Sequence, residues 1–260
     1  DGTVSLSNLS ISPNGKFIAY SISDGGSDWK TWKVLDLEAN KVLEDSIKWT
    51  KFSSGNWESD NSGFYYQKYP EPKEVALSEI NRSPKLYFHK IGTSQEEDLL
   101  VYERPDKPNW SWDVQVSEDG QYRILSVGEG TDDSNRLYIK FVNDISFIPV
   151  VADLEATYIF LGSKGTDLWF FTNKNSPNGK IVKLKVNENK SFLWEDVIKE
   201  ASFSISGFSL INNKFVIEYL VDSQSKVDFF NLNGDYLASL DLPNAGSISG
   251  FNGKMKDRHT

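Results

Sequence analysis

The residues that could carry out chemistry in this chain are few, and histidine is the scarcest of them. Hydrolysis by a serine nucleophile needs a histidine base and an orienting acid beside the serine. The chain has two histidines, His89 and His259. His89 lies in Leu86-Tyr-Phe-His-Lys90, where the alternation of side chains predicts an outward strand position. His259 is the penultimate residue, where a fixed geometry is not expected.

A nucleophile elbow is also missing from the sequence. The Gly-x-Ser-x-Gly pattern, which exposes a serine at a strand-to-helix turn, does not occur. The nearest string is Gly246-Ser-Ile-Ser-Gly250, whose serines occupy other positions and whose pattern is typical of a strand. The sequence therefore predicts no catalytic residue in this chain and no enzymatic activity for it alone.

Metal and cofactor motifs are equally scarce. The chain has no cysteine, no His-x-x-x-His pair and no phosphate-binding glycine loop. Two acidic clusters, Asp132-Asp133 and Glu96-Glu97-Asp98, are interpreted as solvated turns. We therefore expect neither a metal site nor a cofactor.

Charge and hydropathy limit the classes of partner. The net charge is −9 and the pI is about 4.9, which argues against a nucleic-acid surface. No apolar run approaches the roughly eighteen residues of a membrane span. The absence of cysteine fits a reducing cytoplasm and is also compatible with the periplasm.

The elements that would position any site are short strands. Aromatic and β-branched runs of this kind, separated by turn residues, include Phe17-Ile-Ala-Tyr-Ser-Ile22, Gly63-Phe-Tyr-Tyr66, Tyr122-Arg-Ile-Leu-Ser-Val127 and Leu168-Trp-Phe-Phe171. Several are apolar at nearly every position, as in strands whose sheets are covered on both faces. Only Trp194–Ala201 is compatible with a short helix.

The strands recur with a longer period. Turn residues before strong strands at Gly15, Gly63, Gly120, Gly165, Asn213 and Gly253 are spaced by 48, 57, 45, 48 and 40 positions. Four short strands per 40–50 residues are typical of a β-propeller. We predict an all-β propeller of four-stranded antiparallel blades near 1–49, 50–107, 108–154, 155–201 and 202–245, with 246–260 beginning a sixth. An irregular β-sandwich is the alternative.

The second interval is the longest because of one proline-rich stretch. Residues 69–84 contain three prolines and several charges, which oppose pairing in a sheet. They predict a long connecting loop, either functional or a solvated excursion.

The ordered strings of the chain resemble one family. The most specific are Gly26-Ser-Asp-Trp29, Lys51-Phe-Ser53, Asp106-Lys-Pro-Asn-Trp110, Asn135-Arg-Leu-Tyr138 and Gly250-Phe-Asn-Gly-Lys-Met-Lys-Asp257. Together they resemble the propeller of the prolyl oligopeptidases over almost the whole chain.

The resemblance implies both a fold and a role. Members of that family are cytoplasmic serine peptidases that cut short peptides after proline. Their seven-bladed propeller covers the active site of an α/β-hydrolase domain, which is not found in this sequence. The resemblance places an apolar substrate subsite at Phe52, with two further subsite positions at Ser111 and Thr131, where this sequence is more polar.

Two functions follow as alternatives. The first is a non-catalytic propeller fragment of a prolyl-oligopeptidase-like enzyme, whose partners are the hydrolase domain and short peptides. The second is a free-standing interaction scaffold. About five blades of seven would leave apolar end faces, so we also expect self-association or a rearrangement that covers those faces.

Overall fold

The computed structural model describes residues 3–72, 81–242, 244 and 246–257. Its regular structure in these ranges is β-strand, apart from a 3-10 helix over Gln95–Glu97. The expected all-β fold is therefore confirmed. The chain forms two compact units, Asp1–Ala152 and Asp153–Thr260. No helix in the described ranges has the length and apolarity that crossing a bilayer requires.

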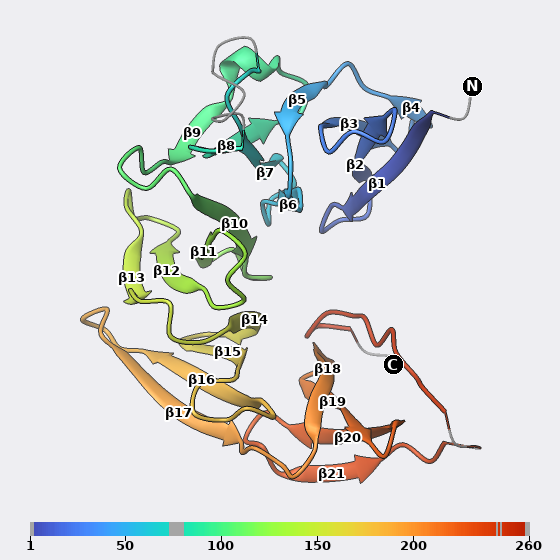
Figure 1. Ribbon diagram of the computed structural model, residues 1–260, viewed down its shortest axis with the longest axis vertical. Helices are drawn as coiled ribbons and strands as arrows, with labels where there is room; N and C mark the ends of the chain where they lie inside the picture. The colour runs from blue at the N-terminus through green and yellow to red at the C-terminus, as the bar shows by residue number, and fades with distance from the viewer. Residues whose placement is uncertain (1–2, 73–80, 243, 245, 258–260) are drawn as a thin grey trace. The chain divides into compact units, whose positions relative to one another are not determined.

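The strands of the first unit alternate with tight turns in the way that the apolar runs predict (Figure 1). They are β1 (Val4–Ile11), β2 (Phe17–Asp24), β3 (Lys30–Asp36), β4 (Lys41–Val42), β5 (Ile47–Thr50), β6 (Asn56–Trp57), β7 (Gly63–Lys68), β8 (Lys85–Lys90), β9 (Leu99–Tyr102), β10 (Trp110–Val116), β11 (Tyr122–Glu129), β12 (Arg136–Phe141) and β13 (Ile148–Val151).

These strands form two antiparallel sheets. One is four-stranded, in the order β10-β11-β12-β13, and the other is nine-stranded, with a main path β1-β2-β3-β5-β7-β8-β9. β5 makes the larger sheet continuous, because Trp32 on β3 pairs with Ile47 and Thr50 pairs with Lys68 on β7. Of the predicted loop 69–84, residues 73–80 lie outside the described part of the chain.

The sheet around β7 and β8 is covered on both faces. On one face Trp32, Phe64 and Tyr66 belong to a buried cluster with Ala19 and Val34. On the other face Tyr65 and Leu86 pack against Trp112, Val114 and Leu125 of the second sheet. Alternate residues of one strand therefore enter two different cores, which explains why these strands are apolar at nearly every position.

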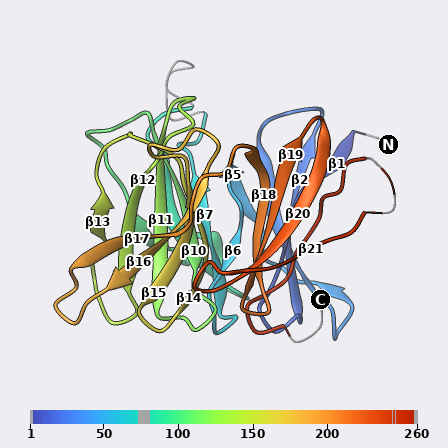
Figure 2. The ribbon, with the colours of Figure 1, turned by 90° about the horizontal axis from the view of Figure 1, so that it is seen from below.

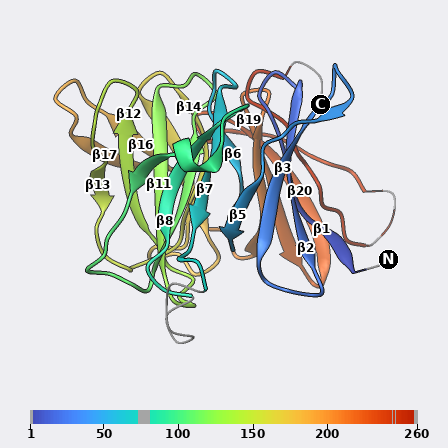
Figure 3. The ribbon, with the colours of Figure 1, turned by 90° about the horizontal axis from the view of Figure 1, so that it is seen from above.

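The first strand carries an uncovered apolar face. Its burial pattern is exposed at most positions, and a bulge between Leu6 and Asn8 shifts the register by one residue. Because of that bulge Val4, Leu6, Leu9 and Ile11 pair with residues on β2 that are spaced by two. All four side chains therefore point to the same face of the sheet, and all are exposed. Figure 3 shows β1, β2 and β3 side by side.

The second unit contains two four-stranded antiparallel sheets, each with its strands in chain order. Figure 2 shows β18, β19 and β20 side by side. The strands are β14 (Tyr158–Lys164), β15 (Asp167–Thr172), β16 (Lys180–Val186), β17 (Phe192–Ile198), β18 (Ser204–Ile211), β19 (Lys214–Val221), β20 (Gln224–Asn231) and β21 (Tyr236–Ser239).

Trp194–Ala201, the one segment compatible with a short helix, is not helical. Strand β17 occupies Phe192–Ile198, and Trp194 pairs with Leu184 of β16. The ring of Trp194 packs at 5.5 Å from those of Tyr158 and Phe170. Pairing with β16 and this aromatic contact outweigh the weak local preference for a helix.

The last sheet differs from the first because the following segment covers it. Phe251 and Ile248 pack on Val216 and Val227, on the face opposite the Phe215 core. Backbone hydrogen bonds such as Asn212 N to Lys254 O fix this segment. The described residues 246–257 form no strand there. One of the two apolar end faces that the sequence predicts is therefore covered within the unit itself.

Candidate functional site

Phe52 lies in the short connection between β5 and β6, and its ring faces outward. The connection alternates, with Lys51, Ser53 and Gly55 buried and Phe52 and Ser54 exposed. Phe52 is 70% exposed, so it does not pack between sheets. Its φ of 47° lies in the left-handed region, which costs a non-glycine residue roughly 1–3 kcal/mol. The surrounding structure must supply that free energy.

Three residues at and near Phe52 have a left-handed backbone conformation. Trp49, Phe52 and Gly55 have φ values of 61°, 47° and 64°. At Gly55 a glycine is required for a second reason, because a Cβ there would lie 2.5 Å from Cη2 of Trp32. The Trp32 ring, buried in the core, therefore fixes where the connection returns to the sheet.

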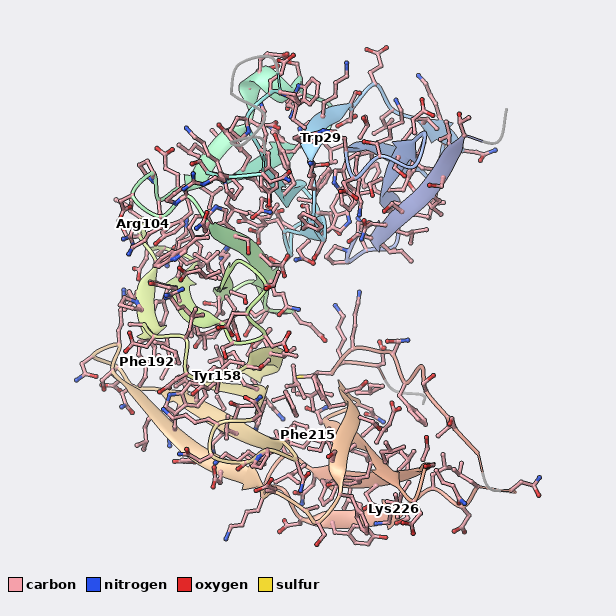
Figure 4. All side chains as sticks on the ribbon, viewed as in Figure 1. Trp29, Arg104, Tyr158, Phe192, Phe215 and Lys226 are labelled. Carbon is pink, nitrogen blue, oxygen red and sulfur yellow. The ribbon has the colours of Figure 1, made fainter. Side chains whose placement is uncertain are left out.

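Lys51 anchors one side of Phe52. It is only 4% exposed, and its ammonium donates to Oδ1 of Asn81 at 2.7 Å. The same ammonium lies 3.8 Å above the ring of Trp29, whose position Figure 4 marks. Trp29 in turn contacts Trp49 edge-on. Burial lowers the pKa of Lys51 and the carboxylate of Asp28 opposes that change only in part.

Gln67, near the end of β7, forms hydrogen bonds to both neighbours of Phe52 in the chain. Its backbone N–H donates to Oγ of Ser53 at 3.1 Å. Its amide Nε2 donates to the carbonyl oxygen of Lys51 at 3.4 Å and to the hydroxyl of Tyr69 at 3.1 Å. Its Oε1 accepts from the backbone N–H of Trp112 at 2.6 Å. The residues on both sides of Phe52 are therefore bound to one buried residue, Lys51 to its side chain and Ser53 to its backbone.

Of the other two predicted subsite residues, one lies on the neighbouring sheet and the other in a turn that follows one of its strands. Ser111 is half-buried on β10, opposite Gly128 of β11, and Thr131 is exposed just after β11. Ser111 precedes Trp112, so the hydrogen bond to Gln67 joins the Phe52 connection to the strand of Ser111. The three residues thus lie on or beside adjacent sheets of one unit. Their role as a subsite stays a prediction.

A second polar contact joins the same two elements. Nδ2 of Asn56 donates to Oδ1 of Asp113 at 3.0 Å. Burial raises the pKa of Asp113, and hydrogen bonds from Ser54 and Asn56 oppose this rise without cancelling it. The contacts at Gln67 and at Asp113 together hold the Phe52 connection and β6 against β10.

His89 corrects the sequence-based expectation, because it is fully buried and not outward-facing. Both faces of the sheet are covered at this point, so alternation along β8 does not turn His89 toward solvent. Its Nδ1 donates to Asp98 at 2.7 Å and its Nε2 to Asp45 at 2.8 Å, and the ring lies 5.5 Å from that of Phe64. Burial lowers the pKa of His89, but the two carboxylates outweigh burial and raise the pKa to about 9. The ring is therefore an imidazolium at neutral pH.

This arrangement decides what His89 can do. Both ring nitrogens are bound to carboxylates, so neither is available to accept a proton from a serine. Asp98 was expected in a solvated turn, and that expectation is wrong, since its side chain is buried and also accepts from Tyr66 at 2.7 Å. Glu96, Glu97, Asp132 and Asp133 are exposed as expected. Over the described residues no group of acids and histidines could hold a metal ion. His259 lies outside the described residues.

A pocket of about 570 Å³ lies at the ends of β5, β7 and β8 and carries charges of both signs. Lys85 pairs with Glu103 at 2.8 Å, and Glu96 lies within electrostatic reach of Lys48 and Lys68. The lysine cations of the pocket therefore lie near carboxylates. Its lining residues are Lys48, Trp49, Lys68, Tyr69, Pro70, Glu71, Ser83, Lys85, Tyr87, Gln95 and Glu96.

Sequence reasoning missed Gln67 and the role of Lys51. A signal for Gln67 exists, since a polar residue directly follows the apolar run Gly63-Phe-Tyr-Tyr66 inside a strand buried on both faces. A buried amide in such a position needs hydrogen-bond partners from other elements. The identity of those partners depends on the tertiary fold and is not encoded in the local pattern.

Comparison with protein families gives one match over the whole chain. The model of the prolyl oligopeptidase N-terminal beta-propeller domain matches residues 1–260. The prolyl endopeptidase of Elizabethkingia meningoseptica is 34% identical over 259 residues, covering 99% of this chain and 36% of that protein. That of Elizabethkingia miricola is 35% identical over the same length. The chain thus spans little more than a third of these relatives.

Solved structures agree with the sequence matches. A structure from a study of two prolyl endopeptidases, concerned with inter-domain dynamics in catalysis and specificity, has a TM-score of 0.88 and 30% identity, with 96% of this chain and 36% of that chain covered. Prolyl oligopeptidase B from Galerina marginata, bound to a 25mer macrocyclization substrate, has a TM-score of 0.92 and 27% identity, with 99% and 38% covered.

Proposed function

The chain belongs to the family of prolyl oligopeptidase N-terminal β-propeller domains, and from this membership we propose its role. In a full-length protein it covers the active site of an α/β-hydrolase domain and restricts substrates to short proline-containing peptides. The hydrolase domain supplies the nucleophile and the base. The propeller supplies one wall of the subsite that binds the peptide residue two positions before the proline.

The observation that carries this proposal is the conformation of Phe52. A large apolar ring that is 70% exposed contributes little to the core, yet its backbone is held in a strained conformation between two buried residues. Strain that the surrounding structure maintains is typical of ligand-binding positions. An exposed aromatic ring on a rigid support offers apolar contact area at low entropic cost.

The polar residues beside Phe52 refine the proposal. Ser111 and Thr131 replace apolar contact with hydroxyl groups on the neighbouring sheet. We therefore infer a subsite with one apolar wall, provided by Phe52, and one wall that can donate or accept hydrogen bonds. Such a subsite accepts apolar side chains, but an apolar side chain contributes less binding free energy there than in a wholly apolar subsite.

The test uses the full-length protein that contains this chain. Two reporter peptides, Phe-Gly-Pro and Ala-Gly-Pro with the same leaving group after proline, differ only in the residue that would meet Phe52. We expect a higher kcat/KM for the Phe peptide, and we expect Phe52→Ala to reduce that preference about fivefold, as losing one aromatic contact of roughly 1 kcal/mol implies. The control is Leu99→Ala, since Leu99 is similarly exposed on β9.

Two results would contradict the proposal. A full-length protein that does not cleave either peptide is not a prolyl peptidase. If Phe52→Ala leaves the preference for the Phe peptide over the Ala peptide unchanged, Phe52 is not part of the subsite.

A free-standing interaction scaffold is the second candidate, and the apolar face of β1 favours it. Val4, Leu6, Leu9 and Ile11 are all exposed on one face of the sheet. Contiguous exposed apolar patches mark association sites. The open reading frame distinguishes the two candidates, because a scaffold would have no α/β-hydrolase domain in the same frame.

A further inference from the structure

Gln67 is a buried polar residue at the junction of three elements. It is 1% exposed, and the two residues before it in β7, Tyr65 and Tyr66, face two different cores. An unpaired amide in such a position would cost roughly 1–3 kcal/mol, so its partners determine where it is tolerated. Those partners are Lys51 just before Phe52, Tyr69 beyond the end of β7, and Trp112 on strand β10.

The chemistry of the amide fixes the geometry of this junction. A glutamine side chain has one carbonyl oxygen and two N–H donors in a rigid plane. Here the oxygen accepts from Trp112 N, while the nitrogen donates to Lys51 O and to Tyr69 Oη. One planar group therefore sets the distance between the backbone before Phe52 and the backbone after Ser111.

The backbone of Gln67 adds a constraint on the other side of Phe52. Its N–H donates to Oγ of Ser53. Lys51 and Ser53 are thus both bound to Gln67, and Phe52 is the residue between them that projects outward. A displacement of the Gln67 side chain therefore moves Lys51, while the backbone of Gln67 still holds Ser53.

We propose that Gln67 is a positioning residue for the subsite, which sets the placement of the Phe52 ring relative to Ser111 and so the selectivity for apolar peptides. This inference rests on the proposed function. Gln67 does not touch the substrate. It acts through Phe52, and this distinguishes it from a residue that only stabilises the fold.

The experiment measures a ratio that is independent of the amount of folded protein. In the full-length protein, kcat/KM for the Phe-Gly-Pro reporter is divided by that for the Ala-Gly-Pro reporter. Gln67→Leu removes all three side-chain hydrogen bonds, and Gln67→Asn keeps an amide that is one methylene too short to span Lys51 O and Trp112 N. We expect each to reduce the ratio about threefold to fivefold, close to the effect of Phe52→Ala.

A double-mutant cycle separates positioning from general destabilisation. If Gln67 acts through Phe52, then adding Gln67→Leu to Phe52→Ala leaves the ratio unchanged from that of Phe52→Ala alone. His89→Gln is the matched control, because it disrupts another buried polar network on β8 that makes no hydrogen bond to the Phe52 connection. We expect it to lower stability and leave the ratio unchanged.

The outcomes distinguish the two levels of the proposal. If Phe52→Ala reduces the ratio and both Gln67 variants do not, the positioning role is wrong and the subsite stands. If Gln67→Leu lowers the ratio equally in the Phe52→Ala background, Gln67 acts by another route and the inference is overturned. If Phe52→Ala itself has no effect, the proposed subsite fails and the role of Gln67 fails with it.

Discussion

His89 on β8 and Asp45, 44 positions earlier in the chain, share a fully buried hydrogen bond of 2.8 Å between Nε2 and Oδ1. Asp98 binds the other ring nitrogen, and Tyr66 donates to Asp98. Burial raises the pKa of Asp45, but hydrogen bonds from His89 and from the backbone of Gly92 outweigh burial, and the pKa of Asp45 is lowered. The cluster joins β7, β8 and the segment before β5 in one ionic network.

The first prediction concerns this network and pH. The pKa of His89 is raised from 6.5 to about 9 in the folded protein, so its stabilising contribution is complete below pH 6.5 and is lost as pH rises through about 9. We expect the free energy of unfolding to fall by about 3 kcal/mol between pH 6.5 and pH 9.5. Urea denaturation at several pH values measures this fall.

The control for this prediction is His89→Gln. It leaves two buried carboxylates without their cation, so we expect a loss of about 3–5 kcal/mol at pH 6.5 and a much smaller dependence on pH above that value. A wild-type protein whose stability is the same at pH 6.5 and 9.5 would show that His89 is neutral in the folded state.

The second prediction concerns Gly55. A Cβ at this position would meet Cη2 of Trp32 at 2.5 Å, and the φ of 64° disfavours any other residue. We expect Gly55→Ala to lower the free energy of unfolding by about 2–4 kcal/mol, measured by urea denaturation, because the Trp32 ring is held in the core. Gly15→Ala is the matched control.

Gly15 isolates the backbone contribution. It has a φ of 73°, similar to that of Gly55, but no atom lies within 4 Å of its Cβ position. We expect Gly15→Ala to cost only about 1 kcal/mol. Equal effects at the two positions would mean that Trp32 moves aside and does not fix the Phe52 connection.

The strands of this protein could be predicted from sequence because their residues carry a local signal. Runs such as Tyr122–Val127 and Lys214–Leu220 are strands β11 and β19 in the structure. The local pattern around Trp194 was compatible with a helix as well as a strand, because the pairing with Leu184 that makes it a strand is non-local. The spacing of the turn residues predicted the repeat. The local pattern did not predict that β5 pairs with both β3 and β7 and so joins the larger sheet.

The site was predictable only in part. The resemblance predicts a subsite role for Phe52, which stays a prediction, and the structure shows an exposed ring there. The burial of His89 escaped prediction because alternation assumes that a strand has one solvated face, whereas Leu86 and His89 on β8 are both buried. Gln67 escaped because its three partners come from separate elements, and only the folded chain brings them within hydrogen-bond distance.

The third prediction concerns the apolar face of β1. The bulge after Leu6 keeps Val4, Leu6, Leu9 and Ile11 on one face, and their partners on β2 continue it with Ile18, Tyr20 and Ile22. An exposed apolar edge strand is prone to associate with another chain. We predict that the 260-residue chain, expressed alone, self-associates through this face at micromolar concentration. Sedimentation velocity should show a weight-average mass that rises with concentration.

Charge substitutions on β1 test whether this face is responsible. Leu6→Lys combined with Leu9→Lys places two ammonium groups in the centre of the strip without changing the pairing of β1 with β2, since both side chains are exposed. Burying those charges in an interface would cost several kcal/mol, so we expect the double variant to sediment as a monomer. The same substitutions at Leu99 and Leu100, which are exposed on β9 at the other end of the sheet path, form the control and should leave association unchanged. A wild-type chain that sediments as a monomer at all concentrations, or association that persists in the β1 variant, would show that this face is tolerated in water and that the apolar strip has no partner in a second copy.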